Sequence, residues 1–126
     1  KADMANIERA IEVSHTIGMA DIGASVVVDK QVIAVEAAEG TARMLERVVQ
    51  MRQKVKKSSG VFAKMTKPNQ DLRIDIPAIG VDTVNAVAAA HLRGIVVNTK
   101  TCFVVNKPAV ISAADKRGIF ILAMDE

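Results

Sequence analysis

The fold class can be inferred from residues 94–124, which read GIVVNTKTCFVVNKPAVISAADKRGIFILAM. Two runs in this stretch, residues 95–97 and 119–124, are continuously apolar, as expected for strands that are covered on both faces. Between them the pattern predicts a helix over residues 106–117, which Gly118 ends. A succession of buried strand, helix and buried strand is typical of an α/β layered domain.

The rest of the chain continues this alternation of helices and strands. Apolar residues at helical spacing predict helices, and short β-rich runs predict strands. In chain order the predicted elements are a helix over 3–16, a hairpin of strands 25–29 and 32–37, a helix from Thr41 to about Gln53, a strand over 61–66, a helix over 83–92 capped by Asp82, and strands over 94–99 and 101–106. We therefore expect one α/β domain over residues 1–126, with a mixed β-sheet flanked by about four helices.

Composition narrows the classes of protein that need to be considered. The chain has 126 residues, of which 50% are hydrophobic and 25% charged, and this composition is that of one globular domain. Cys102 is the single cysteine, so no internal disulfide is expected and a reducing compartment fits. No signal peptide or membrane-spanning run is visible, and the start at Lys1 rather than Met is compatible with a fragment of a longer protein.

Positive charge is concentrated in one stretch of the sequence. Residues 52–67 carry six basic side chains and no acidic one, whereas the whole chain has 17 basic and 14 acidic residues. The stretch indicates a local anionic partner, although a solvated helix end is the preferred interpretation for residues 54–57. Nucleic acid is not favoured, because the chain has no Trp, no Tyr and three Phe with which to stack bases.

The strongest candidate for chemistry is the segment 64–80. Its residues 71–76 alternate, so that Asp71, Arg73 and Asp75 share one side of an extended backbone, with neighbours roughly 6.5–7 Å apart. Two carboxylates at this spacing could hold Mg²⁺ or Mn²⁺, or one of them could act as a general base for water.

Basic residues and prolines decide between two interpretations of this segment. Lys64 and Lys67 precede the carboxylates and add the positive charge that a phosphate site needs. The structural alternative is an edge strand with a salt-bridged solvent face. Pro68 and Pro77 bracket the segment and favour a shaped loop over a plain central strand.

A second candidate is the strand-to-helix junction at residues 35–41. Gly40 and Thr41 would present backbone N–H groups at a helix N-terminus, where anions bind, and Glu36 and Glu39 could face a metal or a sugar hydroxyl. An ordinary glycine turn with a capping threonine explains the same residues somewhat better.

The remaining polar features favour structural roles. Residues 79–83 form a third helix start, for which capping is the simpler role. His15 and His91 lack partners at metal-ligand spacing, and Cys102 lies in an apolar run typical of a core residue.

Two motifs in this order resemble the carboxy-terminal domain of the LpxI family. They read VEAAEGT at residues 35–41 and KxxKPxQDxRxDxPxIGxxT at residues 64–83, and the resemblance extends through essentially the whole chain. The family comprises the UDP-2,3-diacylglucosamine pyrophosphatases of lipid A synthesis. The resemblance implies a metal-dependent hydrolase that releases UMP and 2,3-diacylglucosamine 1-phosphate, with Mg²⁺ or Mn²⁺ as the cofactor.

The resemblance also implies roles for individual residues. It implies one essential acid, Asp75 or Asp71, of which Asp75 is preferred. From the residues themselves we expect Asp71, Asp75 and Glu39 as the metal ligands. The substrate phosphates would be bound by a set of basic, amide, hydroxyl and backbone groups, namely Lys64, Lys67, Arg73, Gln70, Gly40 and Thr41.

Further expectations concern the setting of the chain. As the second domain of a two-domain enzyme, it would need an N-terminal half that the sequence does not contain. The implied setting is the cytoplasm, with peripheral contact at the inner membrane of a Gram-negative bacterium and a homodimer as a further expectation. Two alternatives remain open, namely a non-catalytic module that binds a sugar phosphate or nucleotide, and an assembly domain that only dimerises.

Overall fold

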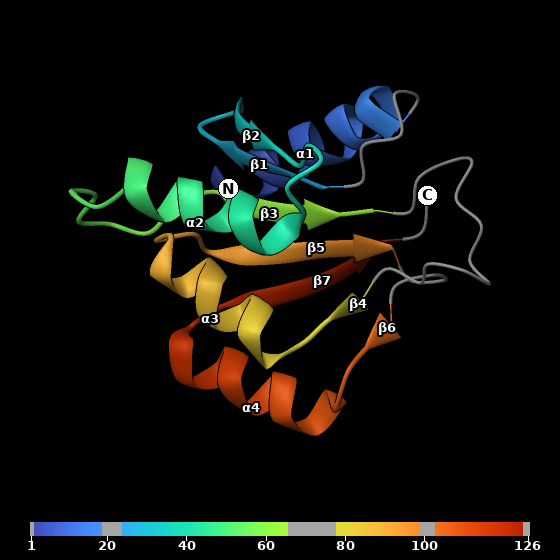
Figure 1. The fold of residues 1–126 in the computed structure, drawn as a ribbon, viewed down its shortest axis with the longest axis vertical. Coiled ribbons are helices and arrows are strands. Elements are labelled where there is room, and N and C mark those ends of the chain that lie inside the picture. Colours follow the sequence, from blue (N-terminus) through green and yellow to red (C-terminus); the bar gives the residue numbers. More distant parts are fainter. Residues whose placement is uncertain (1, 19–23, 66–77, 99–102, 125–126) are drawn as a thin grey trace.

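The computed structural model describes residues 2–18, 24–65, 78–98 and 103–124. Four helices and seven strands alternate along these residues (Figure 1). In chain order they are α1 (Ala2–Gly18), β1 (Ala24–Val28), β2 (Gln31–Val35), α2 (Thr41–Met51), β3 (Val61–Lys64), β4 (Ala78–Ile79), α3 (Val81–Ala89), β5 (Gly94–Asn98), β6 (Phe103–Val104), α4 (Lys107–Arg117) and β7 (Phe120–Met124). No helix among the described residues is both long and apolar enough to cross a membrane.

Five of the strands form one mixed sheet in the order β2-β1-β3-β5-β7. The strand β1 is antiparallel to both β2 and β3, whereas β3, β5 and β7 are parallel to one another. The short strands β4 and β6 form a second, parallel pair. The predicted α/β domain with a mixed sheet and four helices is therefore confirmed.

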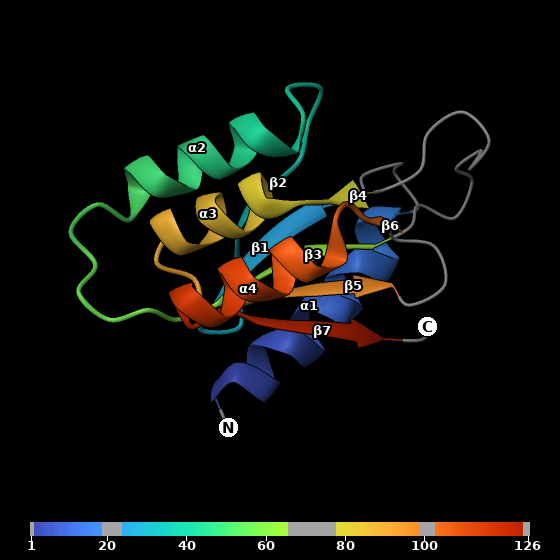
Figure 2. The same ribbon diagram turned by 90° about the horizontal axis from the view of Figure 1, so that it is seen from below.

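The helices cover the two faces of the large sheet unequally. The helices α2, α3 and α4 lie on one face and α1 lies on the other (Figures 1 and 2). Because successive side chains of a strand point to opposite faces, Val26 contributes to the core under α2–α4 and Val27 to the core under α1. Each such buried aliphatic side chain stabilises the fold by about 1.5–3 kcal/mol relative to exposure.

The β1–β2 hairpin turns without a glycine. Asp29 and Lys30 take its two left-handed positions, with φ values of 52° and 64°. The backbone N–H of Lys30 donates to Asn6 Oδ1 at 2.8 Å, and its carbonyl accepts from Arg9 Nε at 3.3 Å. Side chains of α1 therefore stabilise a turn that glycine usually forms.

Several predicted boundaries were wrong by a few residues. Gly40 and Gly80 are the N-caps of α2 and α3, where Thr41 and Asp82 were expected, because their carbonyls accept the first helical hydrogen bonds at 3.1 Å and 3.2 Å. His91 was expected inside a helix but follows α3 with a φ of 59°. The strand expected at 101–106 is described at Phe103–Val104. The segment 66–77, for which a shaped loop was favoured, and Cys102 lie outside the described residues.

Candidate functional site

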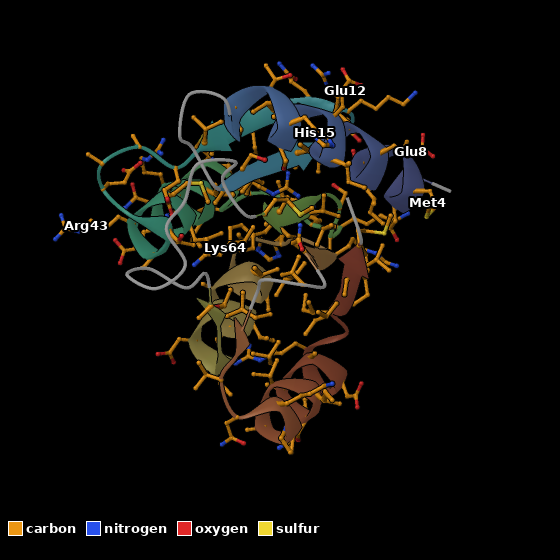
Figure 3. The ribbon with its side chains drawn as sticks, turned by 90° about the vertical axis from the view of Figure 1, so that its right-hand side faces the viewer. Met4, Glu8, Glu12, His15, Arg43 and Lys64 are labelled. Atoms are coloured by element: carbon orange, nitrogen blue, oxygen red, sulfur yellow. The ribbon has the colours of Figure 1, made fainter. Side chains whose placement is uncertain are left out.

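Polar groups gather where the parallel strands end. Because β3, β5 and β7 run in one direction, their last residues, Lys64, Asn98 and Met124, lie at the same edge of the sheet. The helices α2, α3 and α4 begin at this edge (Figure 1). Figure 3 looks onto this edge, with Lys64 near its centre and Arg43 further out on α2. In open α/β sheets, ligands bind outside the carboxyl ends of the strands.

Both sequence motifs reach this edge, and the strand β1 lies between the two strands that lead into them. The N–H of Glu36 donates to the Ala24 carbonyl at 2.9 Å, and Ala24 is the register partner of Lys64 on the other side. Since neighbouring strands are about 4.8 Å apart, the backbones of Glu36 and Lys64 are about 10 Å apart. Side chains 28 positions apart in the sequence can therefore contact one small ligand.

Lys64 is the basic side chain of the second motif that the structure describes. It is half-buried, and its Nζ donates to the Ala78 carbonyl at 3.0 Å. One carbonyl leaves two of the three ammonium hydrogens of a lysine for other acceptors. Lys64 therefore brings a partly desolvated positive charge to the centre of the edge.

The first turn of α2 contributes backbone donors and one hydroxyl group. Gly40, with a φ of 90°, precedes the helix, and the Thr41 hydroxyl donates to the Glu36 carboxylate. The first backbone N–H groups of a helix have no intrahelical acceptor and carry partial positive charge. Thr41 also fixes the position of Glu36, so one carboxylate lies beside these donors.

Glu39 is held in an ion pair. Its two carboxylate oxygens accept from Arg47 Nε at 3.0 Å and Arg47 Nη2 at 2.5 Å, and Arg47 Nη2 also donates to the Val35 carbonyl at 3.2 Å. The Arg47 hydrogen bonds lower the pKa of Glu39 below its usual value, and slight desolvation opposes them. A carboxylate that already binds a guanidinium is a poor choice for a metal ligand.

The described residues contain no cluster of three possible metal ligands. Within 2–18, 24–65, 78–98 and 103–124, no group of three or more His, Cys, Asp and Glu side chains lies close enough to hold an ion. Of the three metal ligands expected from the sequence, Glu39 is paired with Arg47, and Asp71 and Asp75 lie outside these ranges.

The starts of α3 and α4 enclose a shallow hollow of about 420 Å³. The N–H of Gly80 donates to Thr83 Oγ1 at 3.2 Å, so Thr83 caps the helix start as expected for residues 79–83. Val105 is 49% exposed and donates its N–H to the Ile79 carbonyl at 2.9 Å. The hollow therefore adds apolar surface beside Lys64, whose amine contacts the neighbouring Ala78.

The structure describes half of the residues that the sequence singled out. Gly40, Thr41, Glu36, Glu39 and Lys64 lie at this edge. The others, Lys67, Gln70, Asp71, Arg73 and Asp75, lie outside the described residues.

Sequence reasoning missed three polar side chains at or near this edge, namely Arg43, Arg47 and Asn98. Arg43 is exposed in the first turn of α2, and Asn98 is 8% exposed at the end of β5. An asparagine that ends the apolar run 94–97 was the signal for Asn98. The (i, i+4) spacing of Arg43 and Arg47 was the signal for a basic helix face.

These features define an α/β domain with a polar edge at the carboxyl ends of its parallel strands, where one half-buried lysine lies beside the N–H groups of a helix N-terminus. The sequence model of the LpxI C-terminal domain matches residues 1–122, and the chain therefore belongs to the LpxI C-terminal domain family. The resemblance inferred from the two motifs is confirmed.

One curated relative is similar along nearly the whole chain. It is the UDP-2,3-diacylglucosamine pyrophosphatase LpxI of Caulobacter vibrioides, which is 45% identical over 127 aligned residues. The alignment covers 97% of this chain and 45% of the relative, so the chain spans less than half the length of the relative.

Proposed function

We propose that the chain is the C-terminal part of an enzyme that hydrolyses UDP-2,3-diacylglucosamine to UMP and 2,3-diacylglucosamine 1-phosphate in lipid A biosynthesis. The observation that carries the proposal is the 45% identity with the Caulobacter vibrioides pyrophosphatase over 97% of the chain. The position of Lys64 and the first turn of α2 at the carboxyl ends of the strands supports it, because a diphosphate needs positive charge and N–H donors.

The described residues would act by binding the diphosphate. The Lys64 ammonium and the backbone N–H of Thr41 would face its oxygens, joined by Lys67, Gln70 and Arg73 of the second motif. The N–H of Gly40 donates to the Ala37 carbonyl at 3.5 Å, so Gly40 would contribute through the turn that it forms. When water attacks one phosphorus atom, the bridging P–O bond breaks and negative charge develops on the departing phosphate. Cations beside the bridging oxygen, which leaves with the departing phosphate, stabilise the transition state more than the ground state.

Asp75 would be the essential acid, with Asp71 beside it. One of these carboxylates would accept the proton of the attacking water. The pair would also be the ligands of Mg²⁺ or Mn²⁺, an ion that would stabilise charge on phosphate oxygens. Glu39 is left out of this proposed ligand set because Arg47 occupies its carboxylate.

The proposal includes the setting of the enzyme. The longer protein would supply an N-terminal part, and its diacyl substrate would bring it to the inner surface of a bacterial inner membrane. Association of two copies belongs to the same proposal.

The test is UMP release by the longer protein, measured with Mg²⁺, with Mn²⁺ and with a chelator. We expect Asp75→Asn to abolish turnover, because it removes the proposed base and metal ligand. Lys64→Met should lower kcat by about 10²–10³-fold, because it removes a cation that faces the reacting phosphate. Asp115→Asn, an exposed carboxylate on α4, is the matched control and should retain the rate.

Each result has a definite meaning. A folded wild-type protein that releases no UMP with either ion contradicts the proposed reaction. A folded Asp75→Asn variant with normal turnover contradicts the role of Asp75, and the same measurement on Asp71→Asn then decides whether Asp71 takes that role. Turnover that persists in the presence of a chelator contradicts the proposed dependence on a divalent metal ion.

A further inference from the structure

The edge of the sheet opposite the candidate site carries an excess of positive charge. Seven exposed cations and three carboxylates, Asp3, Asp29 and Asp115, lie on the segments at this edge. The Arg9–Glu12 ion pair reaches it as well, since Arg9 Nε donates to the Lys30 carbonyl at 3.3 Å. Four other cations and five other carboxylates lie elsewhere in the described part of the chain. Buried Arg52 adds a further charge beneath this surface. We call the seven exposed cations the basic edge, namely Lys30, Lys54, Lys56, Lys57, Arg93, Lys116 and Arg117.

Backbone contacts bring the segments of the basic edge together. The N–H of Ser59 donates to the His91 carbonyl at 3.0 Å, and the N–H of Arg93 donates to the Gly60 carbonyl at 2.8 Å. The N–H of Phe120, just after α4, donates to the Arg93 carbonyl at 3.1 Å. In Figure 1 the loop after α2 and the ends of α3 and α4 lie on the left, away from the candidate site.

Most of this charge is not neutralised by the described residues. Arg93 pairs with Asp3 at 3.2 Å, but no ion pair within the described ranges includes the six other cations of the basic edge. Arg52 holds the lysine-bearing loop in place, since its guanidinium donates to the Ser59 carbonyl at 3.2 Å and the His91 carbonyl at 3.0 Å. Arg52 therefore fixes the end of the loop that carries Lys54, Lys56 and Lys57.

An exposed apolar side chain lies next to the lysine-rich loop in the sequence. Met51, in the last turn of α2, is 55% exposed and comes directly before the lysine-rich loop. Exposed apolar side chains flanked by Lys and Arg are typical of surfaces that bind the interface of an anionic membrane. The sequence itself disfavours single-stranded nucleic acid as the partner, because it has no Trp or Tyr on which bases could stack.

We propose that the basic edge binds the anionic headgroups of a lipid bilayer and that Met51 enters the interface. The choice of lipid among anionic partners rests on the proposed function, because the substrate would be a lipid. Each net positive charge at an anionic membrane surface raises partitioning roughly fivefold. Attachment through this edge turns the opposite edge, with Lys64 and Thr41, away from the bilayer. The diacyl substrate would therefore have to leave the bilayer to reach the candidate site.

The test is co-sedimentation of the 126-residue chain with vesicles of phosphatidylethanolamine, with and without phosphatidylglycerol. Binding should require phosphatidylglycerol and should be lost between 0.1 and 1 M salt, as the Debye length falls from about 10 to 3 Å. Lys56→Gln/Lys57→Gln should lower the partition coefficient roughly 25-fold, at about fivefold per charge. Met51→Gln should lower it further, with melting temperatures checked for every variant.

The matched control is Arg43→Gln/Lys107→Gln, which removes two exposed cations at the other edge and should leave binding within about twofold of wild type. Equal binding to vesicles without phosphatidylglycerol overturns the proposal, as does an equal loss in the control. Salt-sensitive binding to duplex DNA without binding to vesicles overturns it in favour of nucleic acid.

A second assay separates this proposal from the proposed function. The basic-edge variants should hydrolyse detergent-dispersed substrate at the wild-type rate when placed in the longer protein. Vesicle binding without any hydrolysis contradicts the proposed reaction alone. Hydrolysis without vesicle binding contradicts only the proposal that the basic edge binds anionic lipid.

Discussion

Replacing Arg52 by Ala should destabilise the domain by about 3 kcal/mol. The side chain is 8% exposed, and its guanidinium donates to the carbonyls of Ala90 at 2.9 Å, His91 at 3.0 Å and Ser59 at 3.2 Å. The end of α3 and the loop before β3 therefore depend on one side chain from the end of α2. Carbonyls at a helix end need partners from outside the helix.

The magnitude follows from these contacts. A hydrogen bond to a charged group contributes about 1.5–3 kcal/mol, so the two shorter bonds contribute about 3–6 kcal/mol. Burial opposes them, since it lowers the pKa of Arg52, while the charge of Asp29 partly offsets this effect. The balance is about 3 kcal/mol, a large fraction of the 5–15 kcal/mol that is usual for a domain.

Urea unfolding followed by circular dichroism measures this loss, because the chain has no Trp or Tyr for fluorescence. With a slope of about 1.5 kcal/mol/M, the midpoint should fall by about 2 M. Arg52→Lys should recover part of the loss, since an ammonium cannot reach all three carbonyls. The control, Lys54→Ala, alters an exposed neighbour and should change stability by less than about 0.5 kcal/mol. A loss below about 1 kcal/mol in Arg52→Ala would refute the reasoning.

Two further predictions concern glycine and pH. Gly60→Ala should destabilise by more than about 2 kcal/mol, because φ is 93° and the new Cβ would lie 2.5 Å from Val28 Cγ2. Gly118→Ala, with a φ of 67° but no atom within 4 Å, should cost about 1 kcal/mol, and equal urea midpoints would contradict the steric argument. The lowered pKa of Glu39 means that its ion pair stabilises the fold at neutral pH and loses this effect as pH falls below 4.5. Glu39→Gln should therefore lower the melting temperature at pH 7, with a gap to wild type that narrows in acid; a constant gap would show that the charge is irrelevant.

The helices and strands were predictable where local pattern governs them. Residues 95–97 are apolar throughout and became part of a fully buried strand. Residues 119–124 were expected to be covered on both faces, but β7 is the edge strand of the sheet and is half-buried, with Ala123 exposed. The β1–β2 hairpin was predicted although its turn lacks glycine, because alternation and β-propensity outweigh one turn position. The start of α4 at Asn106 was predicted correctly. The starts of α2 and α3 were misplaced by one or two residues, since caps depend on which carbonyl accepts the first helical bond.

The sequence predicted the two motifs of the candidate site, but it did not predict that they meet at one edge of the sheet. VEAAEGT suggested an anion site with two free carboxylates, but Arg47 binds Glu39 and Thr41 binds Glu36. Arg47 follows the motif by a turn and a half of helix, so its contact depends on how α2 packs beside β2. Asp71 and Asp75 remain predictions from the sequence.

The sequence alone determined the order of the elements, the α/β class and the family, because hydrophobic periodicity and motif spacing are local properties. The tertiary structure decided that Glu36 and Lys64 flank Ala24 at one edge. It also decided that lysines from three separate segments form the basic edge opposite. The physical reason is strand order. Hydrogen bonds across the sheet place β1 between β2 and β3. This strand pairing is fixed because it buries the apolar side chains on both faces of the sheet beneath the helices.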